Sequence, residues 1–192
     1  GRCLRARGSE KHDAVALHEA WESERAGGAE EDRCGKGTPA ARAARDGRIV
    51  TFGVKPDRPA TESGYISPGE KLRGDIYAGA RFVEKPDEAK AADYIAQGYL
   101  WNSGNFVFAA NDLLDEYSAH DAATVTAAKL AIDKAGSDIG FVTIDPDAFG
   151  EAKATSIDYA VMEKTRRAAV IPVSYGWSDV GSWHAVWELS QH

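Results

Sequence analysis

Short apolar runs alternate with helix-like segments from Gly47 onward, and this alternation restricts the fold more than any other feature of the chain. The run at residues 49–54 (IVTFGV) ends at Lys55-Pro56, where proline cannot donate to a sheet ladder, so we expect a buried strand there. The predicted strands cover residues 49–54, 77–85, 106–108 and 169–175. The predicted helices begin near Pro86, Asn111, Ala122, Ser156 and Ser182. Strands alternating with helices predict an α/β domain with a mostly parallel or mixed sheet.

Two further segments of this region are predicted to be irregular. Residues 57–70 (DRPATESGYISPGE) contain several turn formers and indicate a loop. Residues 101–105 (WNSGN) indicate a tight turn ahead of the short strand at 106–108.

Residues 1–46 have a different character and form a separate unit in our prediction. They are rich in Ala, Gly, Arg and Glu, and one short helical pattern stands out at residues 12–25. Residues 27–47 lack apolar periodicity, which predicts loop or disorder. The CGKGT sequence at 34–38 does not fit the spacing of a phosphate-binding loop, because Glu30 stands where the first glycine belongs. We therefore expect a flexible linker there, and divide the chain into residues 1–46 and 47–192.

Length and charge exclude several classes of protein. The 192 residues suit one domain or part of a larger one. The net charge of −7 argues against a nucleic-acid-binding surface, which is normally basic. Since the chain has no apolar run of about 18 residues, we expect no membrane span. The two cysteines, Cys3 and Cys34, do not form a disulfide framework or a CxxC pair. A soluble cytoplasmic protein is the default expectation.

Two polar groups lie at the ends of predicted strands, and α/β sheets collect their ligands at strand ends. Glu84-Lys85-Pro86 offers a carboxylate for sugar hydroxyls and a cation for a phosphate, provided that the chain bends there. By itself this tripeptide favours a surface ion pair. The WNSGNF sequence at 101–106 offers uncharged donors and acceptors, which suit a sugar. An Asn/Gly-rich turn that bonds its own backbone explains it equally well.

Two later groups contain acids next to predicted helices. In the SIDYAVMEK sequence at 156–164, Asp158 and Glu163 have the positions of ordinary helix-surface acids, and that interpretation is favoured without further context. In WSDVGSW at 177–183, Asp179 lies between a strand and a helix, where a carboxylate can hold a divalent cation over phosphates. The alternative is an Asx turn, and the two flanking tryptophans favour function.

Taken in order, these segments resemble one family. The sequences GRIVTFGVKPDRPAT, GYISPGE, ARFVEKPD, GYLWNSGNF, SIDYAVMEK and IPVSYGWSDVGSW are similar to bacterial mannose-1-phosphate guanylyltransferases, and the similarity covers residues 47–192. The resemblance implies a Rossmann-like nucleotidyltransferase domain with a mixed sheet. It also implies the reaction of GTP with mannose 1-phosphate to give GDP-mannose and pyrophosphate, with Mg²⁺.

The resemblance also assigns roles to individual residues. It implies that Glu84 binds sugar hydroxyls, that Lys85 meets the sugar phosphate, and that Asn102 and Asn105 line the sugar pocket. Asp179 would be a metal ligand and, with Lys85, a catalytic residue. Asp158 and Gly64 complete the implied substrate-binding set.

The sequence departs from the family in two places. The family's Gly-rich loop, GGxGTRLWPLSR, which holds the nucleotide phosphates, has no match in residues 1–46. The family usually has T-G-Y-G-Y-I where this chain has Thr61 to Ile66, so that Glu62 and Ser63 replace a glycine and a tyrosine. We therefore expect an incomplete GTP site and a fragment that is inactive alone.

Two alternatives remain open from the sequence. The chain could belong to a transferase for another sugar 1-phosphate, because one Glu and two Asn do not separate epimers. It could be a non-catalytic binding or assembly module, including one that forms a homo-oligomer. If the first strands of the family's sheet are missing, an apolar sheet edge is expected to be exposed.

Overall fold

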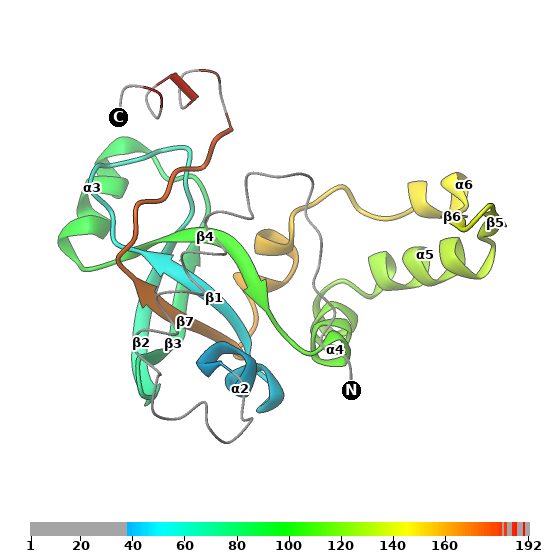
Figure 1. The fold of residues 1–192 in the computed structure, drawn as a ribbon, viewed down its shortest axis with the longest axis horizontal. Coiled ribbons are helices and arrows are strands. Elements are labelled where there is room, and N and C mark those ends of the chain that lie inside the picture. The colour runs from blue at the N-terminus through cyan, green and yellow to red at the C-terminus, as the bar shows by residue number, and fades with distance from the viewer. Residues whose placement is uncertain (1–37, 182, 184–185, 188–189, 191–192) are drawn as a thin grey trace.

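The computed structural model describes residues 38–181, 183, 186, 187 and 190. Five strands form a sheet that closes on itself in the order β1-β4-β2-β3-β7 (Figure 1). The pairs β1–β4, β4–β2, β2–β3 and β3–β7 are antiparallel, whereas β1 and β7 are parallel. The mixed sheet expected from the sequence is confirmed, and β7 pairs with β1, so that this sheet leaves neither strand as an open edge. These strands are β1 (Ile49–Val54), β2 (Tyr65–Arg73), β3 (Ile76–Val83), β4 (Leu100–Val107) and β7 (Ala168–Val173).

Helices and a hairpin occupy the connections between these strands. Figure 1 shows α4, α5 and the hairpin extending to one side of the sheet as an arm, with α3 on the opposite side. The hairpin joins β5 and β6 through Ile139 and Gly140, both at positive φ, and the sequence did not indicate it. The elements are α2 (Pro39–Arg45), α3 (Glu88–Ala96), α4 (Ala110–His120), α5 (Ala122–Asp133), β5 (Gly136–Asp138), β6 (Phe141–Thr143), α6 (Pro146–Gly150) and η2 (Asp158–Met162), which is one π-helical turn.

Three groups of buried side chains stabilise this arrangement. In the first, Ile49, Leu100 and Val170 of the sheet pack with Val161 and Met162 of η2. The second lies where Ala40 and Ala43 of α2 cover apolar residues of β1 and β7. The third packs aromatic side chains of β2, β4 and α3. Since both faces of β1 are covered, all six of its residues are buried, which explains its continuous apolar run.

The helix α2 corrects the prediction of loop or disorder for residues 39–45. It begins after Thr38, whose side chain accepts a hydrogen bond from the Ala41 amide, and its first residue is Pro39. Its apolar side chains are alanines, which give little periodic signal, and packing against β1 and β7 stabilises the helix. The helix predicted at residues 12–25 lies outside the described residues.

Two segments predicted as loop and turn are strands. The predicted loop at 57–70 contains the start of β2, because Tyr65 and Ile66 are fully buried and pair with Trp101 and Leu100. The predicted turn at 101–105 lies within β4, where Gly104 at φ +70° accompanies a shift of register against β1. Tertiary pairing thus overrides the turn propensity of these sequences.

The predicted helix starts are less accurate than the helices themselves. Ala109, not Asn111, precedes α4, and η2 begins without a side-chain cap from Ser156. Asp87 and Asp121 cap α3 and α5 by accepting hydrogen bonds from backbone amides. Ser182, the predicted cap of the last helix, lies outside the described residues.

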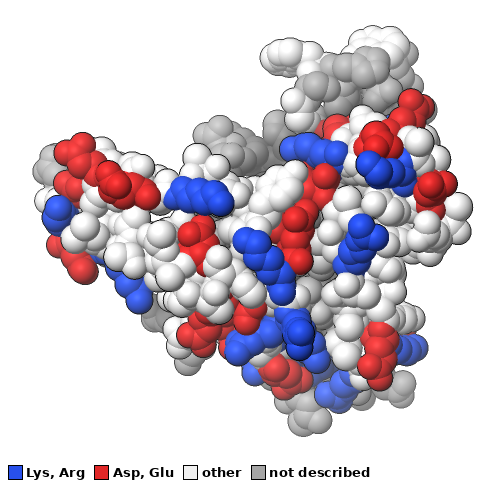
Figure 2. All heavy atoms as spheres, turned by 180° about the vertical axis from the view of Figure 1, so that it is seen from behind, with Lys and Arg blue, Asp and Glu red and all other residues white. Residues whose placement is uncertain are grey.

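The surface carries charges of both signs. Figure 2 shows acidic and basic side chains interspersed over the face opposite to that of Figure 1. Among the described residues, no helix combines the length and apolar character needed to cross a membrane.

Candidate functional site

Four of the predicted substrate-binding residues lie together although they come from different elements. Gly64 precedes β2, Glu84 follows β3, Asn102 belongs to β4 and Asp158 begins η2. All four line one narrow depression, which encloses no space for a water-sized molecule. Its other lining residues are Tyr65, Phe82, Val83 and Glu163.

Asn102 connects three elements through its side chain. Its Nδ2 donates to Oδ1 of Asp158 at 2.9 Å. Its Oδ1 accepts from the Thr51 hydroxyl at 3.1 Å and from the Gly104 amide at 3.2 Å. The backbone amide of Asn102 also donates to the Gly64 carbonyl at 2.8 Å. The side-chain amide of Asn102 is therefore held at once by β1, by its own strand β4 and by η2.

Glu84 and Lys85 lie at a sharp bend of the chain. Lys85 has φ +46°, a left-handed conformation that is rare for a residue with a side chain. Its Nζ lies 3.3 Å from Oε1 of Glu84. The Glu84 side chain is 15% exposed and that of Lys85 63% exposed, so the carboxylate is held inward and the amine reaches solvent. Neighbouring residues of a straight strand point to opposite faces. Because the chain bends here, both side chains can face one ligand.

Glu84 and Asp158, two of the three carboxylates that line the depression, share an environment that disfavours negative charge. Burial raises the pKa of Glu84, and the nearby charge of Asp158 raises it further, while the contact with Lys85 opposes the shift. Burial also raises the pKa of Asp158, against the hydrogen bond from Asn102. A ligand that donates hydroxyl hydrogen bonds to these oxygens, or a cation beside them, would compensate for the lost hydration.

Gly64 allows Glu84 to approach the strand backbone. A Cβ added at Gly64 would lie 2.6 Å from Oε2 of Glu84 and 3.4 Å from Cβ of Asn102. The distance to Oε2 is shorter than an ordinary van der Waals contact, so any side chain at position 64 would displace the Glu84 carboxylate. Gly64 thus shapes the depression by the absence of a side chain.

Two other predicted residues are not brought to this depression. Asn105 is absent from its lining, and its backbone amide donates to Ser103 Oγ at 3.4 Å. Asp179 is exposed on the chain that follows β7. Figure 1 shows this chain, coloured brown to red, rising from the end of β7 past α3.

The Mg²⁺ implied by the resemblance does not find a complete site among the described residues. Within residues 38–181 and the few described positions beyond them, no three His, Cys, Asp or Glu side chains gather as metal ligands. Asp179 offers one exposed carboxylate, and Mg²⁺ commonly binds through one or two carboxylates together with waters and substrate phosphates. Among the described residues Asp179 is thus a possible single carboxylate ligand, without a group of further acids around it.

Glu163 and Thr51 belong to the site and were missed in the sequence. An α-helix would place Asp158 and Glu163 on different faces, but η2 is a π-helical turn in which the Glu163 amide donates to the Asp158 carbonyl at 2.9 Å. Both therefore reach the depression. In the sequence, Thr51 differs from its neighbours only as the one polar side chain in the run IVTFGV.

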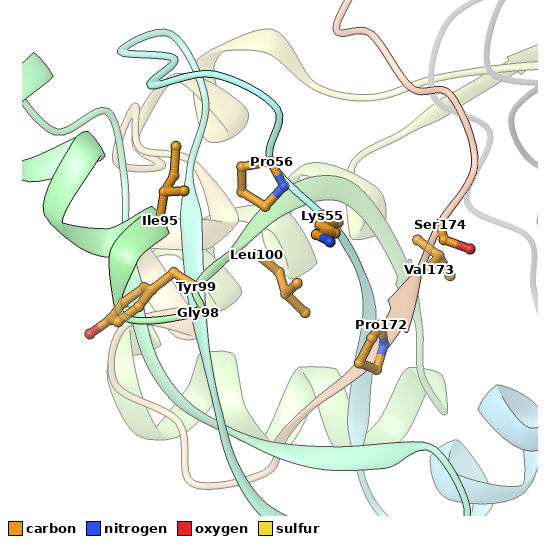
Figure 3. A pocket seen from close by; sticks show the side chains of 9 residues that line it. All are labelled: Lys55, Pro56, Ile95, Gly98, Tyr99, Leu100, Pro172, Val173 and Ser174. Carbon is orange, nitrogen blue, oxygen red and sulfur yellow. The ribbon is translucent and has the colours of Figure 1, made fainter.

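A larger pocket of about 360 Å³ lies elsewhere, next to the ends of β1 and β7 (Figure 3). It shares no lining residue with the depression, and Lys55 is its one charged lining residue. Figure 3 shows Leu100, Val173 and Pro172 around it, with Tyr99 and Ile95 from the side of α3. Its apolar lining does not match the hydroxyls of a sugar, so the smaller depression is the candidate sugar site.

Known proteins are similar to this chain in sequence. Mannose-1-phosphate guanylyltransferase RfbM of Salmonella typhimurium is 46% identical over 148 residues, which are 77% of this chain and 31% of that protein. Mannose-1-phosphate guanylyltransferase of Escherichia coli K12 is 43% identical over 154 residues, 78% of this chain and 32% of that protein. The chain thus spans about a third of the length of these curated relatives.

A solved structure agrees with the sequence relatives. Mannose-1-phosphate geranyltransferase from Thermus thermophilus superposes with a TM-score of 0.70 at 32% identity, covering 91% of this chain and 46% of that one. The family model of the nucleotidyl transferases matches residues 38–192, and so includes α2. The match spans most of the chain and accounts for its mixed sheet, and this protein therefore belongs to the nucleotidyl transferase family.

Proposed function

We propose that this chain carries the sugar-phosphate-binding part of a mannose-1-phosphate guanylyltransferase. The observation that supports the proposal is the meeting of Gly64, Glu84, Asn102 and Asp158 in one depression, with Lys85 beside Glu84. The relatives that match the chain are named for this activity. The carboxylates and the amide suit the hydroxyls of a sugar, and the exposed Lys85 amine suits its phosphate.

In the proposed reaction a phosphate oxygen of mannose 1-phosphate attacks the α-phosphorus of GTP. A new P–O bond forms, and the bond to pyrophosphate breaks. The nucleophile is already anionic, so the main barrier is bringing two polyanions together. Lys85 lowers this barrier by neutralising charge on the sugar phosphate, while Glu84 and Asp158 orient the sugar.

The chain itself is expected to bind the sugar phosphate without forming GDP-mannose. Its sequence has no match to the Gly-rich loop that holds the nucleotide phosphates in the family. The complete reaction is thus proposed for a protein in which this segment is joined to a nucleotide-binding part.

Titration calorimetry of the full 192-residue chain with mannose 1-phosphate tests the proposal. We expect saturable binding that Glu84→Gln and Lys85→Met each weaken by about tenfold, the loss expected for one charge-assisted hydrogen bond. Lys55→Met is the matched control, because Lys55 lines the other pocket. Absence of binding by the wild-type chain, or equal weakening by Lys55→Met, contradicts the proposal.

The same titration separates the alternatives that the sequence left open. Glucose 1-phosphate and galactose 1-phosphate differ from mannose 1-phosphate in hydroxyl configuration, which the fixed amide and carboxylates can distinguish. Tighter binding of either one would assign the chain to another sugar 1-phosphate. Incubation with GTP and mannose 1-phosphate, followed by chromatography for GDP-mannose, tests the expectation that the chain alone does not turn over.

A further inference from the structure

Thr51 is a buried polar side chain with one specific partner. It is 0% exposed, and its hydroxyl donates to Oδ1 of Asn102 at 3.1 Å. It shares a face of β1 with Ile49, which packs in the apolar core with Val170 and Met162. An apolar side chain of the same shape would suit that core better, so the contribution of the hydroxyl lies in its bond to Asn102.

The contacts of Asn102 account for all but one of its hydrogen-bonding positions. The carbonyl oxygen has two lone pairs, and the Thr51 hydroxyl and the Gly104 amide each donate to it. Of the two N–H groups on Nδ2, one is used by the bond to Asp158. One N–H remains, and Asn102 therefore meets a ligand as a donor and not as an acceptor.

We propose that Thr51 is a positioning residue for the sugar-phosphate site: its hydroxyl occupies the Asn102 carbonyl so that the amide presents a single free N–H to a ligand oxygen. The ligand group that fits is a hydroxyl that accepts from Asn102 and donates to a neighbouring carboxylate, Glu84 or Asp158. The identity of the ligand in this inference rests on the proposed function, whereas the contact between Thr51 and Asn102 does not. The backbone of Asn102 is held separately through the Gly64 carbonyl, so Thr51 controls the side chain alone.

The test compares Thr51→Val, which keeps the shape and removes the hydroxyl, with Thr51→Ser, which keeps the hydroxyl. Thr126→Val is the matched control, because the Thr126 hydroxyl bonds only the Ala122 carbonyl of its own helix. In the full ¹⁵N-labelled chain, the side-chain NH₂ signals of Asn102 are assigned by their loss in Asn102→Leu. Calorimetry with mannose 1-phosphate gives the dissociation constant of each variant.

We expect Thr51→Val to shift the Asn102 NH₂ signals and to weaken mannose 1-phosphate binding about fivefold, the loss of one neutral hydrogen bond. Thr51→Ser restores both readouts, and Thr126→Val changes neither. If Thr51→Val does not fold, Thr51→Cys, whose thiol is a weak donor, takes its place with the same expectation.

Unchanged NH₂ signals in Thr51→Val, or an equal loss of binding in Thr51→Ser, would overturn the inference. Its failure is distinguishable from failure of the proposed function. If the wild-type chain does not bind mannose 1-phosphate, the proposed function fails, whereas the NH₂ signals still decide whether Thr51 fixes the amide.

Discussion

The Glu84 carboxylate lies so close to Gly64 that a Cβ on the glycine would be 2.6 Å from Oε2. Oε2 is the end of a flexible side chain, so a larger residue at 64 moves the carboxylate rather than the backbone. The shape of the candidate sugar site thus depends on a glycine whose own contribution to binding is indirect. A substitution at position 64 is therefore expected to change ligand binding more than the stability of the fold.

Gly64→Ala is predicted to weaken mannose 1-phosphate binding about tenfold, because the displaced carboxylate no longer meets the sugar hydroxyls. The free energy of unfolding should change by less than about 1 kcal/mol. Alanine lowers the conformational entropy of the unfolded chain, and this stabilisation offsets the cost of the local shift in the folded state. Gly136→Ala is the control, because a Cβ there meets no atom within 4 Å. Calorimetry and urea denaturation measure the two quantities, and an unchanged dissociation constant for Gly64→Ala contradicts the role given to the glycine.

The stability of the chain should respond to pH through Glu84. Its folded-state pKa is raised above the ordinary 4.5 by burial, so the unfolded chain releases the proton first as pH rises. Stability contributed by the protonated group is therefore complete below pH 4.5 and is lost as pH rises through the raised pKa. Relative to wild type, Glu84→Gln should gain stability across that interval, which urea denaturation between about pH 4 and pH 7 would measure.

Asp87→Asn provides a comparison of opposite sign. The side-chain hydrogen bond with Lys90 lowers the pKa of Asp87 below its ordinary 3.8, so its contribution to stability is present above that value and is lost as pH falls. Relative to wild type, Asp87→Asn should lose stability as pH rises through this lower interval. If the free energy of unfolding of Glu84→Gln, relative to wild type, fell with rising pH as is expected for Asp87→Asn, the burial of Glu84 would be contradicted.

Lys85→Gly is predicted to change stability and binding in opposite directions. Glycine adopts φ +46° without strain, which should stabilise the fold by about 1 kcal/mol, whereas loss of the amine should weaken sugar-phosphate binding about tenfold. Ile139→Gly relieves the same φ of +46° in the β5–β6 turn and should leave binding unchanged. Thermal unfolding and calorimetry measure both effects. Loss of binding in Ile139→Gly would show that the site is coupled to the hairpin.

Arg167 joins the start of β7 to α4. Its guanidinium lies 2.9 Å from Asp112 Oδ1 and 3.2 Å from Glu116 Oε1. Arg167→Met leaves Asp112 without its ion pair and Glu116 with the His120 imidazole as its remaining partner, and we expect a loss of about 1–2 kcal/mol in the free energy of unfolding after allowing for solvent screening. The control is Arg58→Met, whose pair with Glu62 is exposed on both sides and should contribute less than about 0.5 kcal/mol. Equal losses in the two variants, measured by urea denaturation, would refute a special role for Arg167.

Individual elements show how far the sequence predicts the fold. β1 is predicted correctly because an apolar run ending at Pro56 is a local signal. β4 is not, because its Asn-Ser-Gly-Asn sequence favours a turn in isolation and is held extended by pairing with β1 and β2. α2 is missed because its buried face consists of alanines, whose pattern is too weak to distinguish from a linker.

Local sequence patterns predict the alternation of strands and helices and the end of a strand near Pro86, and the resemblance names the candidate site residues. Which of these residues meet depends on the tertiary structure. Asn102 bonds Thr51 and Asp158, which lie 51 and 56 residues away along the chain, and no local pattern encodes such contacts. The tertiary structure likewise separated Asn105 and Asp179 from the depression, added Glu163 to its lining and brought Thr51 into contact with Asn102. The physical reason is that strand propensity and turn chemistry act over a few residues, whereas the register of β1 on β4 and the π-helical turn at Asp158 depend on the packing of the whole sheet.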